Sequence, residues 1–329
     1  MNQACDLMIR IRDLHVTFNT APAPSRAVNG VNLDVHRGEV VALIGESGSG
    51  KSVTLRTLLR LHNERRCRVG GHVSVDGCDV LALSQSQLRR YRGATASMVF
   101  QDPLLAFDPV YPVGHQIIET IMCHERVRRS EAEFRALELF QRVQIPSPER
   151  RLQAYPHEMS GGMRQRAMIA LALACRPKVL LADEPTTALD ATVQIQILLL
   201  LRELQRDLGL SIIFVTHDIG AAVEVADRIA VMYAGRIVEI GTTRELLSAP
   251  LHPYTIALLQ SRHPEAMRRG DRLNTIGGGP PDLAALPSGC AFADRCPVAQ
   301  ANCRTHQPTP IPAESVHRAS CLRLESEVA

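Results

Sequence analysis

The segment from residue 45 to residue 52 has the residue types and the spacing of a loop that binds phosphate. It reads Gly45-Glu-Ser-Gly-Ser-Gly-Lys51-Ser52, with the apolar run Val40–Ile44 before it and a helical pattern after it. Glycines let backbone N–H groups close around phosphate oxygens, and the N-terminus of the following helix adds partial positive charge. In such a loop the lysine reaches the β- and γ-phosphates, and the Ser/Thr hydroxyl binds Mg²⁺. The segment therefore predicts a nucleotide site.

Two acidic residues follow a second apolar run, which reads Lys178-Val-Leu-Leu-Ala-Asp183-Glu184. At the carboxyl end of a central strand, Asp183 is expected to hold Mg²⁺ through water and Glu184 to activate the attacking water as a general base. A third run, Ser211–Thr216, ends at His217, which is placed to contact the γ-phosphate. A histidine at a strand end is more often a cap or a core residue, so its assignment depends on the other motifs.

A second anion-binding pattern opens a helix that is expected to run to about Ala174. It reads Met159-Ser-Gly-Gly-Met-Arg-Gln165, which places a hydroxyl and bare amides at the helix N-terminus. One nucleotide does not easily use two phosphate cradles from one chain. We therefore expect the second cradle to serve ATP that is held by another subunit.

These motifs resemble those of the ATP-binding cassette (ABC) family over roughly residues 7–250. The resemblance assigns Walker A to Gly45, Glu46, Ser47, Gly48, Ser49, Gly50, Lys51 and Ser52, with Val53 following, the Q-loop to Gln101, the signature to Ser160, Gly161, Gly162 and Gln165, Walker B to Val179–Asp183, the catalytic glutamate to Glu184, the D-loop to Ala188-Leu-Asp190 and the switch histidine to His217. It implies that Ser52, Gln101 and Asp183 hold Mg²⁺. It also implies that Phe18 stacks on adenine, although an aromatic residue in an N-terminal strand is otherwise a core residue.

Three further segments look like the oligopeptide, dipeptide and nickel importer branch: Tyr155–Arg166, Ala182–Asp190 and His252–Leu259. Such proteins pair two cassettes beneath two membrane permeases that an extracytoplasmic solute-binding protein feeds. The resemblance implies an ATPase subunit on the cytoplasmic face of the inner membrane that drives peptide uptake, with nickel, glutathione or another small solute left open. Leu105-Ala-Phe-Asp-Pro departs from the usual small-residue-Leu-Asn-Pro, which puts the choice of permease in doubt.

The C-terminal segment holds four of the nine cysteines, Cys290, Cys296, Cys303 and Cys321. Zinc ribbons prefer closely spaced pairs, and four thiolates at wider spacing also suit an iron–sulfur cluster. Some dipeptide-importer cassettes carry a [4Fe–4S] cluster here, so the resemblance implies these four as candidate ligands. His306 and His317 keep zinc open, and unliganded cysteines are the third alternative.

The composition fits a soluble protein that stays inside the cell. The 329 residues are 45% hydrophobic with a net charge of +3, which argues against a nucleic-acid coat. The N-terminus has no basic stretch followed by an apolar one, so we expect no secretory signal. A soluble ABC ATPase that acts on ribosomes or DNA usually carries tandem cassettes. This chain has one, which disfavours that alternative. A non-hydrolysing partner is disfavoured by the intact Glu184 and His217.

The expected architecture is an α/β P-loop NTPase of the RecA-like type in residues 1–250. It includes an antiparallel β-subdomain with a hairpin turn at Asp76-Gly77 and a helical subdomain at about 102–175 that ends in the signature helix. In that subdomain, Arg126-Val-Arg-Arg129 is expected on a solvated helix face. Residues 251–329 form a cysteine-containing extension.

Overall fold

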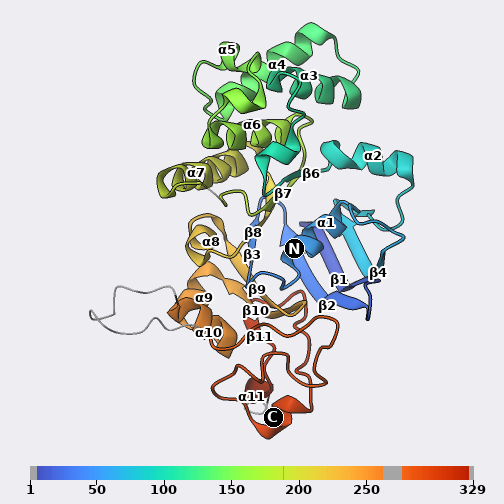
Figure 1. Ribbon diagram of the computed structural model, residues 1–329, viewed down its shortest axis with the longest axis vertical. Coiled ribbons are helices and arrows are strands. Elements are labelled where there is room, and N and C mark those ends of the chain that lie inside the picture. The colour runs from blue at the N-terminus through green and yellow to red at the C-terminus, as the bar shows by residue number, and fades with distance from the viewer. Residues whose placement is uncertain (1–5, 188, 262–275, 326–329) are drawn as a thin grey trace. The chain divides into compact units, whose positions relative to one another are not determined.

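The computed structural model describes residues 6–187, 189–261 and 276–325. The chain divides into two compact units (Figure 1). The first unit comprises Met1–Val35, Val41–Leu81 and Thr216–Ala329, and the second comprises His36–Val40 and Ala82–Val215.

An antiparallel sheet of four strands lies in the first unit, in the order β2-β1-β4-β5. Its strands are β1 (Leu7–Phe18), β2 (Ser25–His36), β4 (Cys67–Val75) and β5 (Cys78–Asp79). Buried and exposed residues alternate along much of β1, as one covered face requires. Asp76 and Gly77 both have positive φ, 49° and 77°, which suits the tight turn from β4 to β5. The predicted hairpin is confirmed.

The P-loop begins where a buried parallel strand of the first unit ends. This strand belongs to a second sheet. The strands that the first unit contributes to it follow the order β11-β10-β9-β3, with β3 (Val40–Ile44), β9 (Arg228–Tyr233), β10 (Arg236–Thr242) and β11 (Arg318–Ala319). All five residues of β3 are buried, and β3 pairs with β9 in parallel. The unit's helices are α1 (Lys51–Leu58), α8 (Ile219–Val225), α9 (Thr243–Ser248), α10 (Pro253–Gln260), η5 (Ala301–Arg304) and α11 (Leu322–Glu325).

The C-terminal segment packs on the strands of the first unit through its own backbone (Figure 1). β11 adds an antiparallel edge to β10. The N–H of Arg26, at the start of β2, donates to the carbonyl of Leu283 at 3.0 Å. Further along β2, the side-chain amide of Asn32 donates to the carbonyl of Ile311 at 3.3 Å. These bonds tie the segment to both sheets of the unit.

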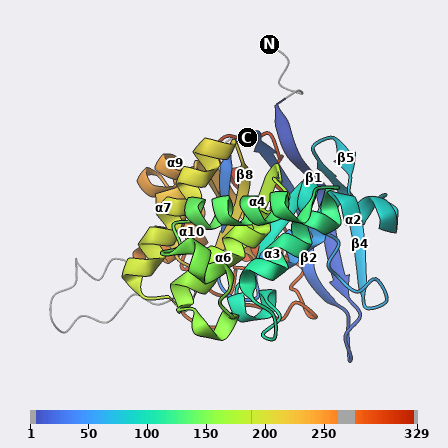
Figure 2. The same ribbon diagram turned by 90° about the horizontal axis from the view of Figure 1, so that it is seen from above.

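The second unit joins three parallel strands to a group of helices. The strands follow the order β8-β7-β6: β6 (Ala96–Val99), β7 (Val179–Asp183) and β8 (Ser211–Thr216). The helices are α2 (Gln85–Ala94), η2 (Pro103–Ala106), α3 (Val113–His124), α4 (Arg129–Arg142), α5 (Pro148–Leu152), η3 (Pro156–Glu158), α6 (Gly161–Leu173) and α7 (Ala191–Leu208). Helices α3, α4 and α6 pack against one another (Figure 2). Helix α6 matches the predicted signature helix.

The arginine run is exposed as predicted, but its placement on a helix face is wrong. Arg126 and Arg128 lie in the connection between α3 and α4, and only Arg129 is helical. Helix α3 ends early because Glu125 leaves the helical conformation and its carboxylate pairs with Arg135 of α4. Among the described residues, no helix combines the length and the apolar character needed to span a bilayer.

Candidate functional site

The P-loop follows β3 and lies directly against the backbone of two other strands. A Cβ added to Gly45 would lie 2.1 Å from the carbonyl oxygen of Met232, and one added to Gly50 would lie 2.3 Å from that of Ala27. Both glycines also have positive φ, 150° and 103°. Only glycine fits these positions, so the packing fixes the shape of the loop.

Lys51 begins α1 and turns back over the loop. Its side chain is buried, and Nζ donates to the carbonyl oxygens of Gly45 and Glu46, each at 2.8 Å. Ser52 and Val53 follow in the first turn of α1 and are half-buried, whereas Ser47 and Gly48 at the tip of the loop are exposed. The ammonium group and the open amides at the tip form a cradle suited to a polyphosphate.

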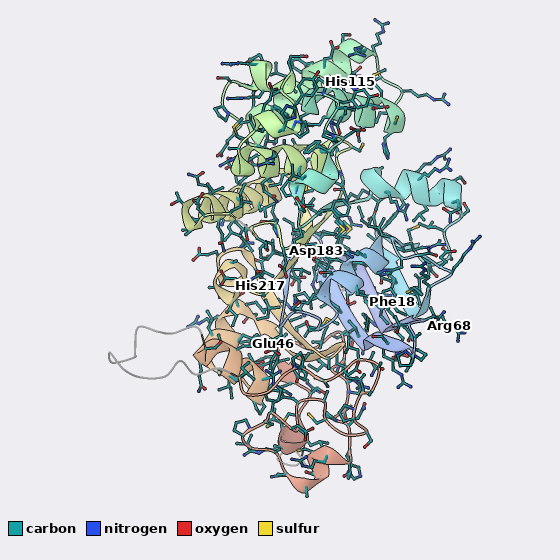
Figure 3. The ribbon with its side chains drawn as sticks, in the orientation of Figure 1. Phe18, Glu46, Arg68, His115, Asp183 and His217 are labelled. Carbon is teal, nitrogen blue, oxygen red and sulfur yellow. The ribbon has the colours of Figure 1, made fainter. Side chains whose placement is uncertain are left out.

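Glu46 is held by two residues that the sequence analysis did not assign to the site. Its N–H donates to the hydroxyl oxygen of Tyr254 at 2.9 Å, and its carboxylate accepts from Nη1 and Nη2 of Arg295 at 2.6 and 2.9 Å. Glu46, the second residue of the P-loop, is labelled in Figure 3. Tyr254 belongs to the His252–Leu259 segment, and Arg295 lies between two of the cysteines. Neither a tyrosine nor an arginine at such a distance in sequence indicates a phosphate site, so the sequence analysis missed Tyr254 and Arg295.

Phe18 ends β1 and lies in the same unit as the P-loop (Figure 3). It is half-buried, and its ring meets His62, just beyond α1, edge to face with the ring centres 5.5 Å apart. Burial lowers the pKa of His62 and favours its neutral form. The remaining exposed part of Phe18 is compatible with stacking on a base, and that role stays a prediction.

The acidic pair lies in the second unit, at the end of β7. Asp183 is 2% exposed, and Glu184 turns into the left-handed region with φ 48°. One oxygen of Glu184, Oε2, accepts from Nε2 of Gln101 at 3.3 Å and from Oγ1 of Thr187 at 3.0 Å. The structure therefore brings Gln101 and Glu184 together. Thr187, which the sequence analysis did not single out, is the second donor.

The signature serine and the D-loop aspartate are both helix caps. Oγ of Ser160 accepts from the N–H of Met163 at the start of α6, and the carboxylate of Asp190 accepts from the N–H of Val193 at the start of α7. A Cβ on Gly162 would lie 2.8 Å from Cγ1 of Val193, so the two helix starts pack closely. Capping leaves the serine hydroxyl hydrogen for another acceptor.

The other predicted positions differ in exposure. Gly161 is exposed at the first turn of α6. Gln165 is 2% exposed, and its Nε2 lacks a hydrogen-bond partner within the described part of the chain. Ala188 of the predicted D-loop lies outside the described residues. His217, which follows β8, belongs to the first unit and is exposed (Figure 3).

The four C-terminal cysteines lie close enough to interact electrostatically. Cys290 interacts with Cys296, Cys303 and Cys321, and burial raises the pKa of Cys290 and of Cys296. The N–H of Cys290 also donates to the carbonyl of Cys303 at 2.8 Å. Nevertheless, within residues 6–187, 189–261 and 276–325, no group of three or more His, Cys, Asp or Glu side chains is arranged to hold a metal ion.

The two histidines that kept zinc open have other partners. Nε2 of His317 lies 3.3 Å from the carboxylate of Glu239, and Nδ1 of His306 bonds with the hydroxyl of Thr305 at 2.8 Å. The side chains therefore do not form a metal site as they stand in this structure. The cysteine set fits an iron–sulfur cluster in residue type but not in arrangement.

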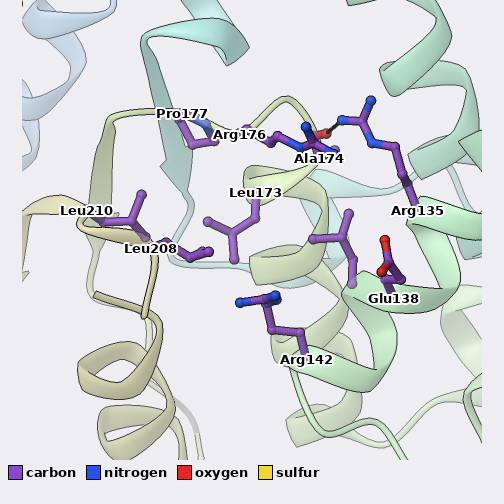
Figure 4. A pocket seen from close by; sticks show the side chains of 10 residues that line it. Arg135, Glu138, Arg142, Leu173, Ala174, Arg176, Pro177, Leu208 and Leu210 are labelled. Carbon is purple, nitrogen blue, oxygen red and sulfur yellow. Dashed lines mark hydrogen bonds between the residues drawn. The ribbon is translucent and has the colours of Figure 1, made fainter. Parts of the chain in front are cut away.

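A cavity of about 340 Å³ lies in the second unit, and no predicted site residue is among the residues that line it (Figure 4). Arg135, Arg142 and Arg176 line it together with apolar side chains such as Leu173 and Leu208. The guanidinium of Arg135 is already bound to the carbonyl of Ala174 at 2.9 Å and to Glu125. The cavity plays no part in the nucleotide chemistry derived above.

A glycine-rich loop at the start of a helix and an acidic pair at the end of a buried parallel strand define this chain as a P-loop ATPase. Residues 28–187 match the ABC transporter family, and residues 238–303 match the oligopeptide/dipeptide transporter C-terminal region. A probable peptide ABC transporter ATP-binding protein of Sinorhizobium fredii is 47% identical, with 98% of this chain and 96% of that protein covered. An ATP-binding protein of Brucella abortus, named for peptide import, is 49% identical, with coverage of 92% and 90%. The chain therefore belongs to the ABC transporter family.

Solved cassettes share the fold. One is a dimeric ATP-binding cassette in a post-hydrolysis state with ADP and phosphate; it has a TM-score of 0.65 at 29% identity and covers 72% of this chain and 99% of its own. Another is cbiO1 of Clostridium perfringens, part of an ABC transporter complex, with a TM-score of 0.65 at 27% identity and coverage of 79% and 97%. The expected α/β P-loop fold is confirmed.

Proposed function

We propose that this ATPase drives an importer that carries dipeptides or oligopeptides into the cell. Two observations support the proposal: relatives that are named for peptide transport align over nearly the whole chain, and residues 238–303 match a region described from oligopeptide and dipeptide transporters. Nickel, glutathione or another small solute is the alternative cargo. The cargo contacts the permease and the solute-binding protein, so the side chains of this chain do not select it.

Lys51 binds the β- and γ-phosphates of ATP in this proposal, and the exposed amides at the tip of the P-loop bind their oxygens. The hydroxyl of Ser52, the carboxylate of Asp183 and the amide oxygen of Gln101 are oxygen donors, the ligand type that Mg²⁺ prefers. When bound, Mg²⁺ neutralises charge on the phosphates. The cradle of glycines fits a polyphosphate because a Cβ at Gly45 or Gly50 would collide with backbone.

Glu184 acts as the general base, and the two hydrogen bonds to its carboxylate orient it toward a water. His217 and Lys51 stabilise charge on the transferred phosphoryl group. The contact between Gln101 and Glu184 gives the Q-loop a direct sensor of the base. We propose that Gln101 reports the state of the site to the permease.

A second cassette completes the site in this proposal. The Ser160-Gly-Gly162 loop offers a hydroxyl and amides at the start of α6, and it faces the ATP that the partner holds. Asp190, at the start of α7, lies at the same junction. Two permeases and an extracytoplasmic solute-binding protein are the further partners, and the chain lies on the cytoplasmic face of the inner membrane. Nucleic acid is not among the partners.

The four C-terminal cysteines are the proposed ligands of a [4Fe–4S] cluster, with zinc as the alternative. Their closeness to one another supports this assignment. Loading requires the sulfurs to rearrange, and no step of ATP hydrolysis depends on it. Anaerobic purification followed by iron, sulfide and zinc analysis tests this assignment. The chain is expected to carry metal that Cys303→Ser loses, and equal, trace metal in both proteins would contradict it.

Co-purification tests the importer assignment most directly. The chain is tagged in its native cell, membranes are solubilised gently, and the bound proteins are identified by mass spectrometry. Two permeases, a second cassette and a solute-binding protein are expected, and peptides extracted from the binding protein would define the cargo. Ribosomes or nucleic acid without a permease would overturn the proposal. Uptake of labelled peptide by the cell is measured as well. Lys51→Ala is the negative control in that assay, because it removes the phosphate contact.

A further inference from the structure

Arg295 connects the cysteine-containing segment to the P-loop. It makes two parallel hydrogen bonds to Glu46, at 2.6 and 2.9 Å, although the two residues lie 249 positions apart. The Arg295 side chain is 6% exposed and that of Glu46 is 28% exposed. A bidentate pair between a buried guanidinium and a half-buried carboxylate is stronger and more directional than a surface ion pair.

The guanidinium of Arg295 is fixed on its other sides as well. It lies 5.8 Å from the ring centre of Tyr233 and 5.9 Å from that of Phe292. Its Nη1 donates to the hydroxyl of Tyr233 at 3.2 Å, and its Nε donates to the carbonyl of Gly277 at 2.9 Å. Because these contacts hold the guanidinium in one orientation, it meets Glu46 as a preorganised group.

Glu46 is in turn anchored through three different groups. Its N–H bonds to Tyr254, its carbonyl accepts from Lys51, and its carboxylate pairs with Arg295. Without its partner, this carboxylate would leave a negative charge on the loop that must bind the negative phosphates of ATP. Repulsion between like charges at such short range weakens binding, and partial burial limits its screening.

We propose that Arg295 is a positioning residue of the nucleotide site, which neutralises Glu46 and holds the P-loop in the form that accepts a triphosphate. The inference rests on the proposed ATP-binding role of this loop. It makes the C-terminal segment part of the nucleotide site, through a residue located between Cys290 and Cys296. It assigns Arg295 no contact with ATP itself.

The test measures ATP affinity by equilibrium dialysis, and ATPase kinetics, in the full-length chain. Arg295→Gln is compared with Arg304→Gln as a matched control. Arg304 lies in the same segment and forms an exposed ion pair with Asp294 at 2.6 Å, with no contact to the P-loop among the described interactions. Both substitutions are repeated in a Glu46→Gln background.

Arg295→Gln is expected to weaken ATP binding about tenfold, with the effect in KM and less than about a twofold change in kcat, as for loss of one charged hydrogen-bonded pair. In the Glu46→Gln background the same substitution is expected to change affinity less than about twofold, because the charge it neutralises is gone. Arg304→Gln is expected to match the wild type.

Two results would overturn the inference. One is that Arg295→Gln changes affinity no more than Arg304→Gln; the other is an equal effect with and without Glu46. If Arg295→Gln does not fold, Arg295→Lys provides the same comparison, with about a threefold weakening expected only when Glu46 is present, since lysine keeps the charge but loses the fork. Failure of the wild type to bind ATP would instead overturn the proposed function.

Discussion

The side-chain amide of Gln101 donates a hydrogen bond to the carboxylate of Glu184 across 3.3 Å, although 83 positions separate the two residues. Thr187 donates to the same carboxylate oxygen at 3.0 Å, and the left-handed turn at Glu184 presents the side chain beyond the end of β7. Two donors from different segments thus orient one carboxylate. In the proposed mechanism this arrangement separates the residue that accepts the proton, Glu184, from the residues that orient its carboxylate.

Glu184→Gln should abolish turnover and retain ATP. Glutamine keeps the shape of the side chain but cannot accept the proton of the attacking water, so ATP hydrolysis is expected to fall about 10²- to 10⁴-fold. The variant should then accumulate in a closed, ATP-bound state with its partner cassette. Phosphate release and size-exclusion chromatography with ATP measure the two effects. Normal turnover in this variant would remove Glu184 from the base role.

Thr187→Val should lower kcat and leave the affinity for ATP unchanged. The substitution keeps the volume but removes a donor that orients Glu184, so a fall of about threefold to tenfold in kcat is expected. Thr120→Val is the matched control, because Thr120 makes a comparable bond to Gln116 within α3. Steady-state kinetics of both variants provide the comparison. A rise in KM at constant kcat would show that Thr187 acts on binding instead.

Sequence alone was sufficient where local chemistry determines the structure. The apolar runs Val40–Ile44, Val179–Asp183 and Ser211–Thr216 all form buried strands, since a continuous apolar run suits a strand covered on both faces. Gly50 was expected from the phosphate loop, and its φ of 103° explains why the position needs glycine. These features depend on a residue and its near neighbours.

The long-range contacts that hold the site in place could not be predicted from the sequence. The partner of Glu46 is Arg295, and its selection depends on how the C-terminal segment packs on β9 and α10. The prediction of a helix face at Arg126 was wrong for the same reason: Glu125 pairs with Arg135 of α4, and α3 ends just before it. Periodicity reports which face of a helix is apolar, but not which distant charge ends the helix.

Gly50→Ala should abolish ATP binding and destabilise the chain. The added Cβ would lie 2.3 Å from the carbonyl oxygen of Ala27, so the loop or β2 must shift. A loss of at least about 2 kcal/mol in the free energy of unfolding is expected, together with loss of ATP binding. Gly77→Ala is the control: its φ is also positive, 77°, but nothing lies within 4 Å of the added Cβ. Equal costs at both positions would show that backbone strain, not the collision, dominates.

The last prediction concerns acid stability and the residue that caps α10. His252 is 2% exposed, and its Nδ1 accepts from the N–H of Tyr254, the tyrosine that binds Glu46. Burial lowers the pKa of His252 to about 4, whereas an unfolded histidine titrates near 6.5. The unfolded chain therefore binds more protons between these values, so the stabilising contribution is complete above pH 6.5 and is lost as the pH falls toward 4.

His252→Asn isolates this contribution, because asparagine can cap the helix but does not titrate in this range. Between pH 7.5 and pH 5 the wild type is expected to lose about 2 kcal/mol more unfolding free energy than the variant, as the difference between the two pKa values requires. Urea unfolding at both pH values measures the difference, and carboxylates that titrate in both proteins cancel. Parallel losses in the two proteins would show that His252 is protonated as readily in the folded chain as in the unfolded one. In that event the protonated Nδ1 could no longer accept the N–H of Tyr254, so this cap on α10 would contribute little to the free energy of unfolding.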